Sequence, residues 1–421
     1  MGVLRVRDRP RRRDARASGA ALLIIGALAA CAPGGDARPA DAAALAELPW
    51  DSVVARARGT EVVWRMWRGD PAVNRYVDEW VAPRVAERYG IRLRAVEGQG
   101  AELVNALVVE REARARGGAD LTWINGETFH NLRREDLLQG PWAHVLPSAA
   151  LVDSASNIVM RDSEQELHGF ESPWGRVHFA LIYDSLRTPQ PPRTVDALGR
   201  WIDEHPGRFT HDQSFAGITF LKVLMYATAG GVERFEGGFE EDAYVAGRDS
   251  VLAWIEEHED RFWRAGRVYP FGVAELHRLF ANGEVDFSMS NNQNEAVTKA
   301  RQGVLPASAR PLILRDGTIA NAHYVGIPFN APNPAGAMLV ADLLLSPEAQ
   351  LEKLRAEVWG DGTVLDLDRL SAEWRGRFAE VEGHPGTVPQ DTLSRYARPE
   401  VAPEYHERLQ QDWRERIRGG G

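Results

Sequence analysis

Polar and aromatic side chains follow several predicted strands of the 421-residue chain, and others lie where the chain is expected to cross between two lobes. Together they could bind a polar solute. Amides and hydroxyls hydrogen-bond such a solute, and a cation over a Trp ring is worth about 0.5–2 kcal/mol. Ligands of α/β sheets lie beyond the carboxyl ends of the strands, which selects these positions. The predicted contacts are Trp67, Arg68, Asp70, Asn125, Glu127, Trp174, Ser214, Asn291, Asn292, Asn321, His323 and Tyr324.

The charges in this set favour a small polar organic solute, and a cationic, ring-containing one such as thiamine is the sharpest form of the hypothesis. Asp70 and Glu127 could balance its positive charge. Structural roles are the alternatives: Glu127 could cap the helix after it, Asn125 could belong to a turn, and His323 could be a hydrogen-bonded structural histidine. Trp64 and Trp123 lie within predicted strands and are expected in the core.

Enzyme chemistry finds little support in the motifs. The chain has no G-x-S-x-G, H-E-x-x-H or P-loop sequence, no complete dinucleotide fingerprint and no EF-hand spacing. We therefore predict no catalytic residue, no cofactor and no metal. Two other classes stay open: a secreted carbohydrate-active enzyme that uses Asp70 and Glu127 as paired carboxylates, and a surface lipoprotein without a transport role.

Cys31 carries a separate chemistry, because its thiol is placed to take a lipid. Seven arginines precede an uncharged run, Gly19 to Ala30, which is too short to span a membrane and typical of a signal peptide. We expect export, cleavage before Cys31 and anchoring of the cysteine at the cell envelope. A chain with one cysteine has no intramolecular disulfide.

Charge and length limit the partners and the architecture. Cleavage would remove a net charge of +5 and take the formal charge from −10 to −15, which argues against nucleic acid as a partner. The remaining chain is too long for one ordinary domain and suits two lobes. No later apolar run reaches eighteen residues, and only three of the fifty basic residues are lysines. We expect a monomer.

Strand and helix patterns alternate along the first part of the chain, which favours a parallel α/β sheet. Strands are predicted at 61–67, 91–96 and 119–124, with helices at 42–58, 73–89 and 102–116. After a predicted turn at 172–175, a strand at 177–183 leads into a second set. That set has helices at 195–204, 218–229, 250–265 and 274–281 and strands at 207–211 and 285–290. A third stretch at 319–329 is strand-like, and a helix at 336–345 follows it as the chain returns to the first lobe. Two crossings between lobes would form a two-stranded hinge.

The residues resemble the solute-binding proteins of ABC importers, and within them the YnjB-like group. The segments that carry the resemblance are 119–127, 171–175, 276–280, 283–287, 316–325 and 343–350. The resemblance implies a two-lobed α/β fold of the periplasmic-binding-protein type, with a ligand cleft between the lobes and the permease subunits of an ABC importer as partner. Asn291-Asn292 departs from the pattern expected of the group at that loop.

Five parts follow from the pattern and the resemblance together. They are a signal peptide at 1–30, a tether at 31–45, the first part of lobe 1 at 46–176, lobe 2 at 177–318, and a return at 319–421 that holds the hinge strand, the second part of lobe 1 and a C-terminal helical extension.

Overall fold

The computed structural model describes residues 41–382 and 386–419. Its main sheets are six-stranded and three-stranded. The larger one contains β1 (Glu61–Met66), β2 (Arg92–Glu97), β3 (Leu121–Ile124), β6 (Glu171–His178), β10 (Thr318–Gly326) and β11 (Ala397–Arg398). The smaller one contains β7 (Ala180–Asp184), β8 (Phe287–Ser290) and β9 (Ala309–Leu312), and β4 (Arg161–Asp162) pairs with β5 (Gln165–Glu166).

The first lobe is built around the larger sheet, in which β1 pairs in parallel with β2 and β3, and β10 runs antiparallel to β3. Its core contains Trp64, Val77 and Leu344. Its helices are α1 (Ala42–Ala46), α2 (Trp50–Ala57), α3 (Pro71–Arg75), α4 (Ala82–Tyr89), α5 (Gly100–Glu112), α6 (Glu127–Arg134), α7 (Asn157–Met160), α13 (Pro334–Leu345), α14 (Pro347–Leu354) and α15 (Ala372–Glu382). The π-helical turn η1 (Tyr76–Val81) joins α3 to α4, so the predicted helix over 73–89 is confirmed.

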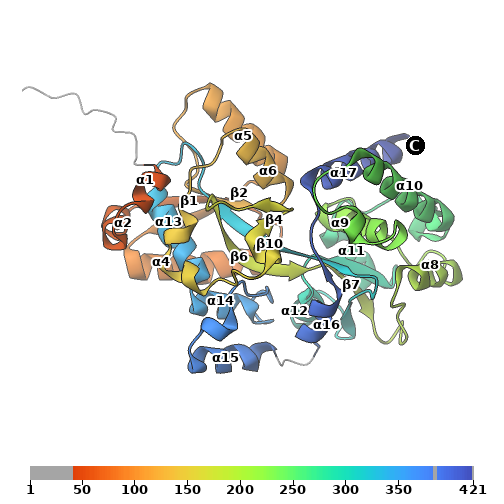
Figure 1. The fold of residues 1–421 in the computed structure, drawn as a ribbon. Coiled ribbons are helices and arrows are strands. Elements are labelled where there is room, and N and C mark those ends of the chain that lie inside the picture. The colour runs from red at the N-terminus through yellow and green to blue at the C-terminus, as the bar shows by residue number, and fades with distance from the viewer. Residues whose placement is uncertain (1–40, 383–385, 420–421) are drawn as a thin grey trace, which may run out of the picture. The chain divides into compact units, whose positions relative to one another are not determined.

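The second lobe is built around the smaller sheet, and its core contains Phe209, Phe220 and Ile255. Its helices are α8 (Val195–Glu204), α9 (Phe215–Thr228), α10 (Glu241–His258), α11 (Val273–Ala281), α12 (Glu295–Arg301), α16 (Gln390–Tyr396) and α17 (Pro403–Gly419). Helices α9, α10 and α17 lie side by side (Figure 1). Tyr405 and Trp413 of α17 belong to this core, so the C-terminal extension completes the second lobe.

Two antiparallel strand segments pass between the lobes. One runs from β6 into β7, and the other runs from β9 into β10. β6 and β10 pair from Ala320↔His178 to Gly326↔Glu171. The two-lobed α/β fold with a two-stranded hinge is therefore the observed architecture. The C-terminal segment passes the hinge as well, because β11 pairs with Thr318 and Ile319.

Some local predictions are wrong. Residues 172–175 are part of β6 and not a turn, since β6 is an edge strand and tolerates Pro173 there. No strand is assigned at 207–211, where the extended chain makes single bonds such as Asp286 N to Arg208 O. Helix α10 begins at Glu241, nine residues before the prediction. Ala42 and Leu45 of α1 are buried, so the packed part of the protein already includes the end of the range predicted as a tether.

In the part of the chain that the structure describes, none of the helices combines the length and the apolar character that crossing a membrane requires. The predicted signal peptide and Cys31 lie outside the described residues.

Candidate functional site

The carboxyl end of β1 presents three predicted contacts in three different settings. Trp67 is 36 % exposed, and its ring meets Trp123 edge-on with 6.4 Å between centroids. Arg68 donates two hydrogen bonds to the carboxylate of Asp78, at 3.2 and 2.5 Å, which holds it away from a solute. Of these side chains, Trp67 keeps the most accessible surface.

Asp70 is not available to balance the charge of a solute. Its carboxylate caps α3 by accepting from Ala72 N at 2.7 Å, and both of its oxygens lie 2.8 Å from Lys299 Nζ. Lys299 belongs to α12 of the second lobe, so this ion pair joins the lobes. In this conformation an internal cation, Lys299, already occupies the carboxylate on which the predicted counter-ion role of Asp70 depends.

The carboxyl end of β3 turns sharply into α6. Gly126 adopts a φ of 55° and its N–H donates to the carboxylate of Asp162 at 2.7 Å. Asn125 is half-buried, and its carbonyl accepts from Thr128 N. Glu127 is the first residue of α6, where a negative charge favours the helix dipole.

The second-lobe loops hold their polar side chains in local turns. Ser214 donates from both N and Oγ to Asp212 at the start of α9. Asn292 donates from N to Ser290 Oγ and accepts from Asn294 N, both at 2.9 Å. Asn291 and Asn292 are half-buried, and parts of both side chains stay accessible.

The hinge residues are mostly interior. Trp174 is fully buried, lies at a bulge in the β6–β10 pairing and packs against Trp64 and Trp123. Tyr324 is fully buried and donates from its hydroxyl to Arg161 O at 3.0 Å. Neither ring presents surface to a solute, so both predicted contacts are structural. The cause is the bulge at Trp174, which turns its ring into the core.

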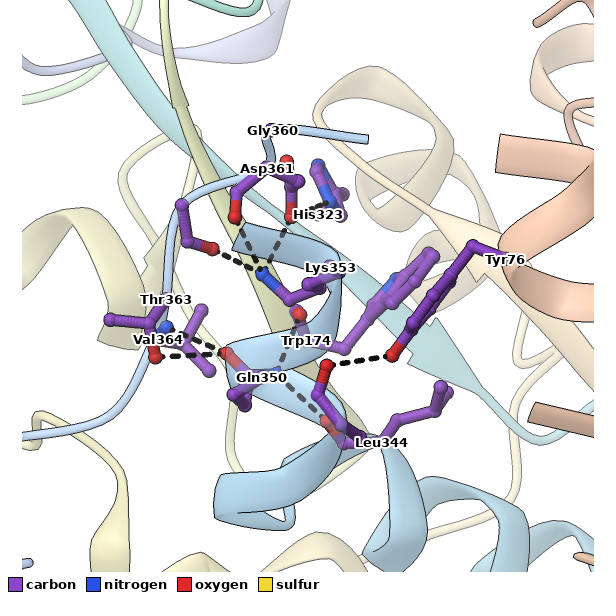
Figure 2. Close-up of polar contacts among 12 residues, drawn as sticks. Tyr76, Trp174, His323, Leu344, Gln350, Lys353, Gly360, Asp361, Thr363 and Val364 are labelled. Atoms are coloured by element: carbon purple, nitrogen blue, oxygen red, sulfur yellow. Dashed lines mark hydrogen bonds and ion pairs between the residues drawn. The ribbon is translucent and has the colours of Figure 1, made fainter. Parts of the chain in front are cut away.

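His323 belongs to a buried polar network that joins α14 to the hinge (Figure 2). Its Nε2 lies 3.2 Å from Asp361 Oδ2, and Lys353 Nζ lies 2.7 Å from the same oxygen. Gln350 donates to the carbonyls of Trp174 and Leu344 and accepts from Val364 N. The structural alternative for His323 is the one that the geometry supports.

Asn321 is the predicted contact that lines a cavity. The cavity has a volume of about 260 Å³ and is bounded by both lobes and the hinge. Its lining comprises Asn157, Ile158, Arg161, Ser163, Glu164, Glu236, Gly237, Ala320, Asn321, Pro399 and Glu400. Three of these side chains are carboxylates and one is a guanidinium, and Arg161 is paired with Glu166. The cavity is therefore electronegative.

The carboxyl groups around the cavity are shifted by burial. Burial raises the pKa of Asp162 to about 8, although the Gly126 amide opposes the change. Burial also raises the pKa of Glu127, against its own backbone amide and the charge of Lys222. Lys222 itself donates to Glu400 at 2.5 Å, and Asn321 Nδ2 donates to the other oxygen of Glu400 at 3.2 Å.

The structure thus divides the predicted site. Asn321 lines the cavity, and Glu127 interacts electrostatically with Lys222 and Glu400 at its edge. Three other predicted contacts have accessible surface away from the cavity: Trp67, Asn291 and Asn292. Sequence reasoning missed Glu164, Glu236, Glu400 and Lys222. The rarity of lysine was the one signal that could have marked Lys222. The described residues contain no cluster of His, Cys, Asp or Glu able to hold a metal ion.

Comparison with known proteins decides the class. A family model described as bacterial extracellular solute-binding protein matches residues 80–374. The chain belongs to this family. It is 33 % identical to protein YnjB of Escherichia coli (strain K12) over 369 residues, which cover 86 % of the chain and 92 % of YnjB.

Solved structures agree on the fold of this solute-binding protein. The periplasmic binding protein AfuA of Actinobacillus pleuropneumoniae matches with a TM-score of 0.59 and 13 % identity, over 85 % of the chain and 99 % of AfuA. A putative spermidine/putrescine ABC transporter of Listeria monocytogenes matches with a TM-score of 0.57 and 17 % identity, over 84 % and 98 %.

The solute-binding component of an ABC transporter is therefore the class of this protein, and both family and fold are those of transporter binding proteins and not of enzymes. The carboxylate of Asp70, one of the two that the hydrolase interpretation needs, is paired with Lys299. A surface lipoprotein without a transport role does not fit the family.

Proposed function

We propose that this solute-binding protein captures a small, polar, cationic organic molecule in the cavity beside Asn321 and Glu400 and delivers it to an ABC permease. The electronegative lining is the observation that carries the proposal. Of its three carboxylates Glu400 is paired with Lys222, which leaves Glu164 and Glu236 beside Arg161, and Arg161 is itself paired with Glu166. A volume of about 260 Å³ is slightly below the roughly 300 Å³ at which pockets for drug-sized ligands begin, so the solute is small.

Hydrogen bonding supports the same proposal. Glu164 accepts from Gly237 N and Gly238 N at 3.0 Å, which brings a turn of the first lobe against a loop of the second at the edge of the cavity. Glu236 directly precedes Gly237 and is exposed, and within the described residues its carboxylate has no ion pair with a basic side chain. Its carboxylate is the most available counter-ion for a bound ammonium or ring cation.

Calorimetry tests the proposal with thiamine and putrescine as cationic probes and glucose as an uncharged one. We expect measurable heat with at least one cation and none with the sugar. Equal affinity for thiamine and glucose would contradict the cationic solute. The structurally similar Listeria monocytogenes protein is a putative spermidine/putrescine transporter, which makes polyamines reasonable probes.

The substitution Glu236→Gln isolates the electrostatic contribution. We expect it to weaken binding of the cationic probe about tenfold, because a charge-assisted hydrogen bond is worth about 1.5–3 kcal/mol. Glu257→Gln is the matched control, since Glu257 is an exposed carboxylate on α10 away from the cavity. An equal loss in both variants would show a general effect of surface charge.

We further propose that the protein acts as a monomer tethered by lipid on Cys31. The thiol ends a signal-peptide pattern, and the anchor would keep the binding lobes close to the permease.

A further inference from the structure

All three lysines of the chain are buried and paired with a carboxylate, whereas the other 47 of the 50 basic residues are arginines. Lys222 lies 2.5 Å from Glu400, Lys299 lies 2.8 Å from Asp70, and Lys353 lies 2.7 Å from Asp361. A buried ammonium is costly unless a carboxylate compensates its charge. The lysines therefore mark three positions where the fold needs a compact charge in the interior.

The pair of Lys299 with Asp70 is the one that joins the lobes directly. Lys299 lies on α12, where Ala296 belongs to the second-lobe core. Asp70 caps α3, where Val73 belongs to the first-lobe core. The ammonium and the carboxylate are therefore close only while the two cores are close.

Neighbouring contacts show how tightly this part of α12 meets the first lobe. Asn294 Nδ2 donates to Gly360 O at 3.0 Å, and Thr298 Oγ1 donates to Trp359 O at 3.3 Å. A Cβ on Gly360 would lie 2.7 Å from Thr298 Oγ1, so only glycine allows this approach. The ion pair thus lies within a packed contact from which solvent is largely excluded.

The surroundings of Lys299 add a second carboxylate. Glu295, one turn earlier on α12, lies 4.0 Å from Lys299 Nζ, and Glu295 also accepts from Ser290 Oγ and lies 3.3 Å from His277 Nε2. If the lobes separated, Asp70 would leave this arrangement, whereas Glu295 would stay beside Lys299 because both are on α12. The charge of Lys299 is then still partly compensated, which keeps the open state accessible.

We infer that Lys299 is a positioning residue for solute capture: its ion pair with Asp70 forms as the lobes close and stabilises the closed conformation without touching the solute. The pair also occupies the carboxylate of Asp70 at the end of β1, so Asp70 does not compete with the exposed Glu236 of the cavity for a cationic solute. This inference rests on closure of the two lobes and not on the identity of the solute.

The test uses Asp70→Asn in the protein without added solute. Asparagine is as good an N-cap as aspartate, so α3 keeps its cap while the ion pair loses its charge. Small-angle scattering measures the radius of gyration, and reductive methylation with peptide mass spectrometry measures the reactivity of each lysine. Lys353 is the internal control, because its partner Asp361 belongs to the same lobe.

We expect a larger radius of gyration and a rate of Lys299 methylation about tenfold higher or more, with Lys353 as protected as before. An unchanged radius of gyration with faster methylation of Lys299 alone would overturn the inference, since the ion pair would then protect Lys299 without affecting the separation of the lobes. Glu357→Gln is the matched control: it removes an exposed carboxylate that pairs with Arg301 across the same interface and should change little.

Faster methylation of Lys353 would mean that Asp70→Asn loosens the fold. The double variant Asp70→Asn/Lys299→Met then decides, because it leaves no uncompensated buried charge at this interface. An expanded radius in the double variant, with Lys353 protected, supports the inference. A radius equal to that of the parent protein overturns it. Because no solute is added, these outcomes are independent of the cationic-solute proposal.

Discussion

At the scale of single residues, burial separates the tryptophans that stabilise the fold from the one that could touch a solute. Trp174 is fully buried among aromatic rings, and Trp67 is 36 % exposed. We predict that Trp174→Ala lowers the free energy of unfolding by about 3–5 kcal/mol, the usual range for a large core side chain. Trp67→Ala should cost much less. Urea denaturation measures both, and equal losses would contradict the assignment.

The buried carboxyl of Asp162 makes stability depend on pH in a defined direction. An unfolded aspartate has a pKa of about 3.9, and burial raises the pKa of folded Asp162 to about 8. Between these values the folded state holds a proton that the unfolded state lacks, so the free energy of unfolding falls as pH rises and levels off above about 8.

Asp162→Asn removes this titration, and we predict a flatter fall of the melting temperature between about pH 5 and pH 8. Burial raises the pKa of Glu171 as well, so the parent and the variant must be compared at each pH. Asp249→Asn, at an exposed side chain, is the control and should run parallel to the parent. Parallel curves for the Asp162 variant would contradict the prediction.

The candidate site shows which single-residue positions a local sequence pattern can place and which it cannot. Asn321 was selected by its place on a crossing strand, and it does line the cavity. Asp70 was selected by the same logic, but its partner Lys299 lies 229 positions away in the chain. Local patterns carry no information on such a pair. The position of Glu400 at the cavity could not be predicted from local patterns either, since the path of the C-terminal segment depends on the packing of α17.

At the scale of elements, α14 and the segment after it hold the hinge through buried polar contacts. Lys353 contacts the carboxylate of Asp361, and Gly362 exchanges backbone hydrogen bonds with Arg176 of β6. We predict that Asp361→Asn lowers the free energy of unfolding by about 3–5 kcal/mol, because it leaves a buried ammonium without its counter-charge. Asp249→Asn should change it by less than about 1 kcal/mol, and a similar loss in both would contradict this role.

Strands with an alternating pattern, such as β1 and β2, could be predicted from the sequence, and so could α13, a fully buried apolar run that begins after Asn333-Pro334. The failures have physical causes. Pro173 and Gly175 favour a turn by composition, yet β10 is the strand that pairs with β6, and the bridge on its other side is formed by Arg176 and not by Pro173, so a missing N–H is harmless there. Residues 207–211 have a strand-like pattern but find only single backbone partners.

At the scale of the whole molecule, the proposed anchor on Cys31 and the two lobes would serve the same function, solute capture beside a permease. A lipid on Cys31 would confine a captor of solutes to the membrane that holds its permease. We predict that Cys31→Ala moves the protein from the membrane fraction to the soluble fraction while probe affinity stays unchanged, because the binding cavity lies wholly within residues 157–400. Fractionation with immunoblotting measures this, and continued membrane association would contradict lipid anchoring at this residue.

Native mass spectrometry of the protein purified from its own cells tests the proposed capture of a small cation most directly. A one-to-one complex is expected, from which denaturation releases a compound that carries positive charge at neutral pH, and Glu236→Gln should reduce the occupied fraction. Release of an anionic or uncharged compound at the same stoichiometry would contradict the proposal.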